Sequence, residues 1–219
     1  MNKKSGQSRQ RYGDNRVRRQ SGIVVRMKQM AELPAILIVC EGEKTEPNYF
    51  RAFGVTQNIY GEGLETIRVV EEAERKNRDL GPFDQVWCVF DRDSFPPDHF
   101  DNAIRKAESL GFRVAYSNEA FELWYLLHFE YLHSALSRNQ YVDKLSKHLG
   151  KSYKKGDVFI YGLLVEKGNE SGAIKNAQKL QELHMDGGSF ARRIPSTTVD
   201  KLVIELRKVQ LGTYQLYCV

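Results

Sequence analysis

Residues 35–46 read Ala35-Ile-Leu-Ile-Val-Cys-Glu41-Gly-Glu-Lys-Thr-Glu46, and residues 86–93 read Val86-Trp-Cys-Val-Phe-Asp91-Arg-Asp93. Each stretch is a short apolar run that ends abruptly in acidic residues. A continuous run of Val, Ile and Leu is typical of a strand buried on both faces, as in a parallel sheet covered by helices. The two stretches therefore predict an α/β fold in which two strands end in acidic residues.

The acidic strand ends predict a metal site. In open sheets of this kind, sites form in the crevice past the carboxyl ends of the strands. Carboxylates gathered at one edge repel each other unless a cation joins them, and hard oxygen ligands suit Mg²⁺ or Mn²⁺. Asp91 and Asp93 are two residues apart, so in an extended chain both carboxylates point to the same side. We therefore expect Glu41, Asp91 and Asp93 to share a divalent cation. The alternatives are a solvated loop acid at Glu41, or a general acid/base there, and a turn that happens to contain acids at 91–93.

Strands and helices alternate along the first part of the chain, which predicts a mostly parallel, Rossmann-like sheet flanked by helices. The expected strands cover residues 35–40, 86–90 and 112–116, with a further short strand left open in the loop 54–63. The expected helices follow Thr45, cover 64–77 and 101–110, and follow Asn118. Beyond about residue 135 the pattern predicts helices at 141–149, 169–184 and 198–209 with no clear strand between them. We expect one α/β domain over 31–219 with a helical C-terminal portion at about 135–219.

A third segment, Ser117-Asn118-Glu119-Ala-Phe121-Glu122-Leu-Trp124, follows the third expected strand. If Asn118 caps the next helix, Ser117 and Glu122 lie at the same rim as the other acids. Glu122 stands in an otherwise apolar stretch, and burying an unpaired charge is costly, so it needs a metal, an Arg or another partner. A structural salt bridge is the alternative. His128 does not match the same helical face and is expected to be structural.

The net charge of +5 is unevenly spread over the 219 residues. Residues 1–30 hold nine Lys or Arg, including Arg16, Arg18 and Arg19, against one acidic residue, so the rest of the chain is net acidic. This composition predicts a flexible basic arm, because it offers too little apolar surface to offset its ordering entropy. Such arms often bind nucleic acid, although a solubilising or subunit-contacting leader is the alternative.

The rest of the composition predicts a cytoplasmic protein. The apolar runs fall well short of the ~18 residues typical of a membrane span, and no secretory signal is expected. Of the three cysteines, Cys40 and Cys88 lie inside expected strands and are predicted to be small buried side chains in a reducing compartment. The chain contains no G-x-x-x-x-G-K-[ST] phosphate loop, so any use of ATP would come from a partner.

The residues that end the strands also resemble a known family. The order strand-Glu41-Gly42, then strand-Asp91-x-Asp93, resembles the Toprim domain of topoisomerases, primases and old-lysogenisation nucleases. The segments 38–50, 90–93, 117–124 and 127–129, together with Pro195-Ser-Thr-Thr-Val199, resemble the RloB-like family. The resemblance implies a Toprim-like nuclease, often encoded beside an ATPase in restriction or abortive-infection loci. It implies that Glu41 is the general acid/base and that Asp91 and Asp93 hold Mg²⁺.

Two hypotheses follow. The first is a Mg²⁺- or Mn²⁺-dependent nuclease acting on DNA or RNA in anti-phage defence with an ATPase partner. Its catalytic residues would be Glu41, Asp91, Asp93 and Glu122. Its nucleic-acid contacts would come from the basic arm (Arg16, Arg18, Arg19) and from Lys44, Arg92, Ser117 and Asn118. The second is a non-catalytic nucleic-acid-binding or adaptor subunit of such a complex. Self-association is left open, and no membrane partner is expected.

Overall fold

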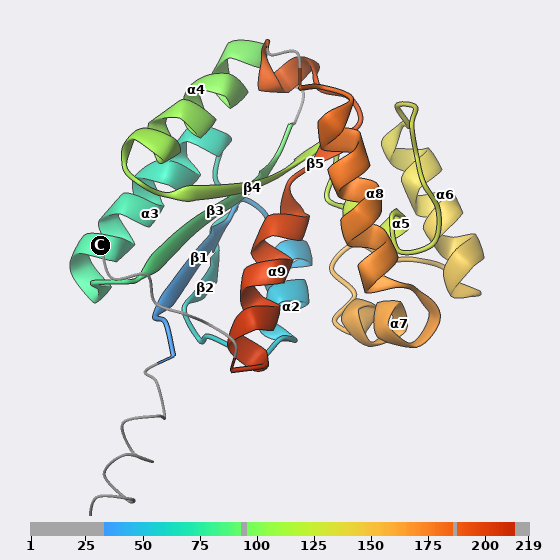
Figure 1. The fold of residues 1–219 in the computed structure, drawn as a ribbon, viewed down its shortest axis with the longest axis horizontal. Helices are drawn as coiled ribbons and strands as arrows, with labels where there is room; N and C mark the ends of the chain where they lie inside the picture. The colour runs from blue at the N-terminus through green and yellow to red at the C-terminus, as the bar shows by residue number, and fades with distance from the viewer. Residues whose placement is uncertain (1–32, 93–95, 186–187, 213–219) are drawn as a thin grey trace, which may run out of the picture. The chain divides into compact units, whose positions relative to one another are not determined.

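The structure is a computed structural model that describes residues 33–92, 96–185 and 188–212. Its centre is a sheet with the strand order β2-β1-β3-β4-β5 (Figure 1). The strands are β1 (Ile36–Cys40), β2 (Ile59–Gly61), β3 (Gln85–Asp91), β4 (Arg113–Asn118) and β5 (Ser196–Thr197). The first four run parallel to their neighbours, and β5 pairs antiparallel with β4. The predicted α/β class with a mostly parallel sheet is confirmed.

The central strands are buried on both faces, as their apolar sequences predict. Every residue of β1 and β3 is buried. One face carries a core that includes Cys40, and the opposite face carries a second core that includes Cys88. Both cysteines are buried and free, and burial raises the pKa of each thiol, that of Cys88 to about 12. They are inert packing side chains, as the sequence indicates.

Helices cover the two faces of the sheet unequally. The face that carries Cys88 is covered by α3 (Thr66–Leu80) and α4 (Pro97–Ser109), and the face that carries Cys40 by α2 (Thr45–Arg51) and α9 (Val199–Gln210) (Figure 1). The core on the Cys40 face continues into a group of helices in the C-terminal half: α5 (Glu122–Leu126), α6 (Arg138–Leu149), α7 (Ile160–Lys167) and α8 (Glu170–Glu182). The predicted helical C-terminal portion is therefore present.

Three local expectations were wrong. Asn118 does not cap a helix, because it is the last residue of β4, pairs with Ser196 of β5, and precedes α5 by four positions. The C-terminal portion contains a strand, β5, whose two residues are too few to give a readable alternation, and a short 3₁₀ helix, Phe190–Arg192, before it. Helix α7 was missed because it is short and contains Gly162, a poor helix former.

Helices α2 and α5 are joined by aromatic side chains. The Trp124 indole donates a hydrogen bond of 2.8 Å to the Tyr49 hydroxyl, and both side chains are fully buried. Tyr49 also makes edge contacts with Phe50 and Phe121. This packing matters for the site because Glu46 lies on α2 and Glu122 begins α5. No helix among the described residues is long and apolar enough to cross a membrane.

Candidate functional site

The carboxyl ends of β1 and β3 bring Glu41 and Asp91 together. Cys40 pairs with Val89, and the Glu41 backbone N–H donates to the Val89 carbonyl at 2.8 Å, so the two strands end side by side. The Glu41 carboxylate then accepts a hydrogen bond of 2.9 Å from the backbone N–H of Asp91. Glu41 is half-buried, whereas Asp91 is buried. The sheet register alone therefore places two of the three expected ligands at one edge.

Asp91 lies in an environment that strongly perturbs its carboxylate. One of its oxygens, Oδ2, accepts a hydrogen bond of 3.0 Å from the Phe121 backbone N–H. The other, Oδ1, is buried without a hydrogen-bond partner among the described residues. Burial, followed by the nearby carboxylates of Glu46, Glu122 and Glu41, raises the pKa of Asp91 well above its usual range. Because four carboxylates influence one another here, we call Glu41, Glu46, Asp91 and Glu122 the acid cluster.

Glu122 enters the acid cluster from the first position of α5. Its side chain is buried, and its Oε1 accepts a hydrogen bond of 3.0 Å from the Tyr153 hydroxyl. Burial and the Glu122 carboxylate raise the pKa of Tyr153 above its usual value, so the phenol stays protonated and keeps donating. The sequence predicted a metal or an Arg as the partner of Glu122. The hydrogen-bond donor found among the described residues is a tyrosine from the loop between α6 and α7, and the metal stays a prediction.

Glu46 was not expected to belong to the site. It lies in the first turn of α2 with its side chain buried, and its carboxylate occupies the space where a Cβ on Gly42 would project. The signal was present in the sequence, since Glu46 follows Glu41 by five residues across a glycine turn. Tyr153 had no comparable signal, because only tertiary packing brings it to Glu122.

The residues that were expected to contact nucleic acid differ in how far their side chains are exposed. Lys44 is exposed just before α2. Arg92 is half-buried next to Asp91, and its Nε is buried without a hydrogen-bond partner in the part of the chain that the structure describes. Ser117 and Asn118 are completely buried. The Ser117 hydroxyl bonds to that of Thr197 at 3.1 Å, and the Asn118 amide donates to the Ala191 carbonyl at 3.1 Å. The Ser117 side chain holds β5 in place, and the Asn118 side chain holds the 3₁₀ helix before β5. Neither side chain is accessible to a nucleic acid in this structure.

His128 is a structural residue. It is buried, its Nδ1 lies 3.0 Å from the Trp124 carbonyl, and burial lowers its pKa to about 4. A histidine that stays neutral in the core and faces a carbonyl orients α5 rather than taking part in proton transfer.

Two groups of expected residues lie outside the described residues. Asp93, the third expected metal ligand, falls in 93–95, and Arg16, Arg18 and Arg19 fall in 1–32. Within the ranges that are described, no group of three or more His, Cys, Asp or Glu side chains is arranged to hold a metal ion. Mg²⁺, however, is usually bound through one or two carboxylates plus substrate phosphates and water. Glu41 and Asp91 fit that smaller requirement, since no described residue donates a hydrogen bond to the buried Asp91 Oδ1.

Comparison with protein families matches most of the chain to one of them. The model of a family described as RloB-like protein matches residues 36–206, a span that includes the whole acid cluster and β5. No curated protein and no solved structure gives a significant match.

Proposed function

The chain belongs to the RloB-like protein family, and from that premise we propose that it is a metal-dependent nuclease that hydrolyses phosphodiester bonds in DNA or RNA. The observation that carries the proposal is the environment of the Asp91 carboxylate. A buried carboxylate next to three other acids, with one oxygen that lacks a donor among the described residues, is costly in its charged form unless a cation compensates it; without a cation it retains a proton. Perturbed carboxylates of this kind are concentrated at functional sites.

Glu41 and Asp91 would hold Mg²⁺ or Mn²⁺, with Asp93 as the third protein ligand. When bound, such an ion stabilises the charge that develops on the phosphate and lowers the pKa of an attacking water. The Asp91 backbone N–H orients the Glu41 carboxylate. Glu41 is half-buried, whereas Asp91 is buried. Glu41 is therefore the better placed of the two to exchange a proton with the leaving oxygen.

The cationic side chains around the acid cluster would contact the substrate phosphates. The buried Nε of Arg92 has no acceptor among the described residues, so it is available to a phosphate oxygen. Glu122 is held by Tyr153 and would keep its place when substrate arrives. Both features support phosphoryl chemistry at this edge of the sheet.

The family resemblance also supports a place in anti-phage defence. We propose an ATPase as the partner, as the resemblance implies, and such a partner would supply any use of ATP because the sequence contains no phosphate-loop motif. Nucleotide hydrolysis by that partner would then control when the acid cluster meets nucleic acid.

The decisive experiment is a cleavage assay with purified protein, with and without the product of the neighbouring gene. Total RNA and plasmid DNA are incubated with it in Mg²⁺, Mn²⁺ or chelator. We expect cation-dependent cleavage of one substrate, and loss of at least about 100-fold in Glu41→Gln and Asp91→Asn, because each removes a charge at the reacting centre. Circular dichroism checks that both variants fold.

Two results of this assay would contradict the proposal. If no cation supports cleavage while nucleic acid still binds equally well to both acid variants, the protein is a non-catalytic binding subunit. A fully active Glu41→Gln variant would remove Glu41 from the mechanism.

A further inference from the structure

The loop between α6 and α7 is strongly basic and ends in an exposed aromatic residue. It reads Gly150-Lys-Ser-Tyr-Lys-Lys-Gly-Asp-Val-Phe159. We call residues 150–159 the lysine loop. The Phe159 side chain is 71% exposed and Val158 is 61% exposed, although both are apolar. Lysines interleaved with an exposed aromatic ring are the pattern by which proteins bind single-stranded nucleic acid.

The lysine loop is fastened to the acid cluster at one point and to α2 at another. The buried Tyr153 donates to Glu122. Three residues later, the Gly156 carbonyl accepts a hydrogen bond of 3.1 Å from the Asn48 side-chain amide of α2. Gly156 has a φ of +78°, and a Cβ there would lie 3.1 Å from the Cβ of Lys44. Lys44 and the lysine loop therefore form one surface beside the site.

Internal contacts set the shape of the lysine loop before any ligand arrives. Lys151 pairs with Asp157 at 3.1 Å, and Asp157 also accepts from the Phe159 backbone N–H at 2.9 Å. The Tyr153 backbone N–H donates to the Ser146 hydroxyl at 2.9 Å. A preformed loop loses less conformational entropy when it binds.

Two open hollows follow the lysine loop. One, of about 340 Å³, lies between it and the turn after β1, and is lined by Gly42, Glu43, Lys44, Thr45, Lys155 and Gly156. The other, of about 490 Å³, is lined by residues 151, 152 and 154–158. Because Lys155 and Gly156 line both, the two hollows are adjacent. They offer an extended strand a path from Val158, the neighbour of Phe159, to the turn that follows Glu41.

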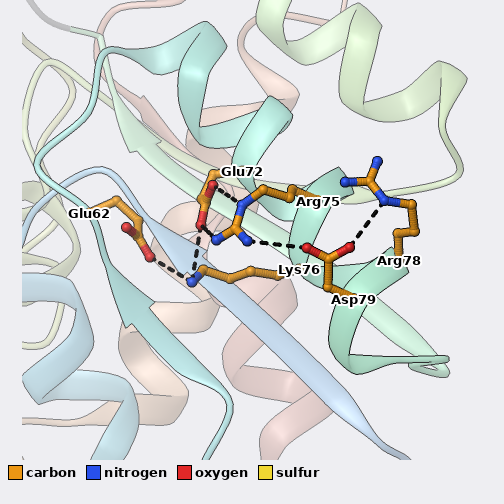
Figure 2. A network of polar contacts seen from close by, with 6 residues as sticks. All are labelled: Glu62, Glu72, Arg75, Lys76, Arg78 and Asp79. Carbon is orange, nitrogen blue, oxygen red and sulfur yellow. Dashed lines mark hydrogen bonds and ion pairs between the residues drawn. The ribbon is translucent and has the colours of Figure 1, made fainter.

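Among the described residues, Asp157 compensates only part of the charge of this surface: it pairs with Lys151 and also lies close enough to Lys154 for that charge to lower its pKa. Lys44, Lys154 and Lys155 form no ion pair within the described ranges. The basic residues of α3 behave in the opposite way. Arg75 and Lys76 share Glu72, Lys76 also reaches Glu62, and Arg78 pairs with Asp79 (Figure 2). Uncompensated lysines next to a cluster of acids point to an anionic partner that must approach those acids.

We propose that Lys44, Lys154 and Lys155 bind the phosphates of a single-stranded nucleic acid, that Phe159 stacks on one of its bases, and that this path leads the strand to the acid cluster. The inference rests on the proposed function, because it takes nucleic acid as the substrate. A single strand is the occupant because only an unpaired base can lay its face on an exposed ring.

The test measures binding without cleavage. Fluorescence anisotropy follows a labelled single-stranded RNA, a single-stranded DNA and a DNA duplex of the same sequence, in chelator, from about 50 to 300 mM KCl. The variants are the triple Lys44→Ser/Lys154→Ser/Lys155→Ser and the single Phe159→Ala. The matched control, Arg75→Ser/Arg78→Ser/Arg105→Ser, removes the same charge from exposed positions on α3 and α4. Residues 1–30 are common to all four proteins.

We expect the triple lysine variant to bind at least about tenfold more weakly at low salt, and its log–log salt slope to flatten by about two, since each phosphate contact with a single strand contributes about 0.7. Phe159→Ala should weaken binding to single strands about fivefold or more and leave the duplex unaffected. The control should bind like the wild type. The RNA and DNA arms show which single strand is preferred.

Folded lysine and Phe159 variants that bind single strands as tightly as the control would overturn the inference. So would a Phe159→Ala variant that loses as much affinity for the duplex as for the single strands. The proposed function fails separately: lysine-dependent binding with no cleavage under any cation leaves the binding surface standing and removes the nuclease.

Discussion

At the scale of single residues, Asp91 combines a structural cost with a proposed function. Its side chain is buried, receives one hydrogen bond, and lies among three acids that raise its pKa. The raised pKa means that the folded protein holds a proton on Asp91 that the unfolded protein would release. The stability that this proton contributes is complete below the ordinary aspartate pKa of 3.8 and is lost as the pH rises through the folded-state pKa.

Asp91→Asn should therefore stabilise the apo protein at neutral and alkaline pH. The amide keeps the size, can still accept from Phe121, and adds a donor toward the neighbouring carboxylates. We expect the melting temperature in chelator to exceed that of the wild type by several degrees at pH 8, at about 2–4 °C per kcal/mol, and the difference to vanish near pH 4. Adding Mg²⁺ or Mn²⁺ should raise the melting temperature of the wild type more than that of Asp91→Asn. A variant less stable than the wild type at pH 8 would contradict this.

Substitutions at Glu122 and Tyr153 distinguish a chemical role of Glu122 from a structural one. Glu122→Gln retains an oxygen that accepts from the Tyr153 hydroxyl, so the free energy of unfolding should change by less than about 1 kcal/mol while cleavage falls at least about tenfold. Tyr153→Phe leaves the buried Glu122 without its donor and should cost about 1–3 kcal/mol. Urea unfolding and cleavage rates measure both. If the Gln variant unfolds before it loses activity, Glu122 is a structural residue.

At the scale of elements, the turn from β1 to α2 depends on a close approach. Glu46 reaches the acid cluster from the first turn of α2 by lying over Gly42, with its Cδ 2.9 Å from the position of a Cβ there. A side chain at position 42 must displace a buried carboxylate, which changes the electrostatics around Asp91 as well as the packing.

Gly42→Ala should cost about 1–3 kcal/mol of stability, as overpacking does, and should lower cleavage activity further than that loss explains. Gly162→Ala in α7 is the matched control, because nothing lies within 4 Å of its added methyl group. That control should be neutral or slightly stabilising, since Ala favours a helix over Gly by up to about 1 kcal/mol. Thermal melts and cleavage rates compare the two. Equal behaviour of the two variants would mean that Glu46 is not held by this turn.

At the scale of the whole molecule, charge is divided between the basic residues 1–30 and a net acidic remainder. Residues 1–30 lie outside the described residues, and their interaction with nucleic acid stays a prediction. We expect a nucleic acid to contact two cationic regions: residues 1–30, through their number of charges, and the lysine loop, through its place beside the acids.

Deleting residues 1–30 should weaken binding to both single- and double-stranded nucleic acid, most strongly at low salt, because each neutralised phosphate releases condensed counterions. The melting temperature should not change. Binding titrations over a range of salt concentrations, with the lysine-loop variant in parallel, measure the two contributions. An unchanged affinity and salt slope would assign residues 1–30 another purpose, such as a protein contact.

The sequence by itself determined the class of fold and the positions of two residues of the candidate site. Continuous apolar runs identify buried strands because a strand buried on both faces tolerates few polar residues. The acidic residues at the ends of these runs are therefore easy to recognise. This is why β1, β3, Glu41 and Asp91 were placed correctly from local pattern, while the role of these acids remains a proposal. The same reasoning failed for Asn118, because pairing with β5 over a long separation kept it extended where its local preference favoured a helix cap.

Only the tertiary structure decided what surrounds those acids. Glu46 enters by the close approach of a helix to Gly42, and Tyr153 enters because the loop between α6 and α7 folds back over α5. Neither contact has a local signature, since each depends on the free energy of packing elements that are distant along the chain. The environment that raises the pKa of Asp91 and the uncompensated lysines beside it are therefore properties of the folded molecule, because burial and the distances between charges exist only once the helices have packed on the sheet.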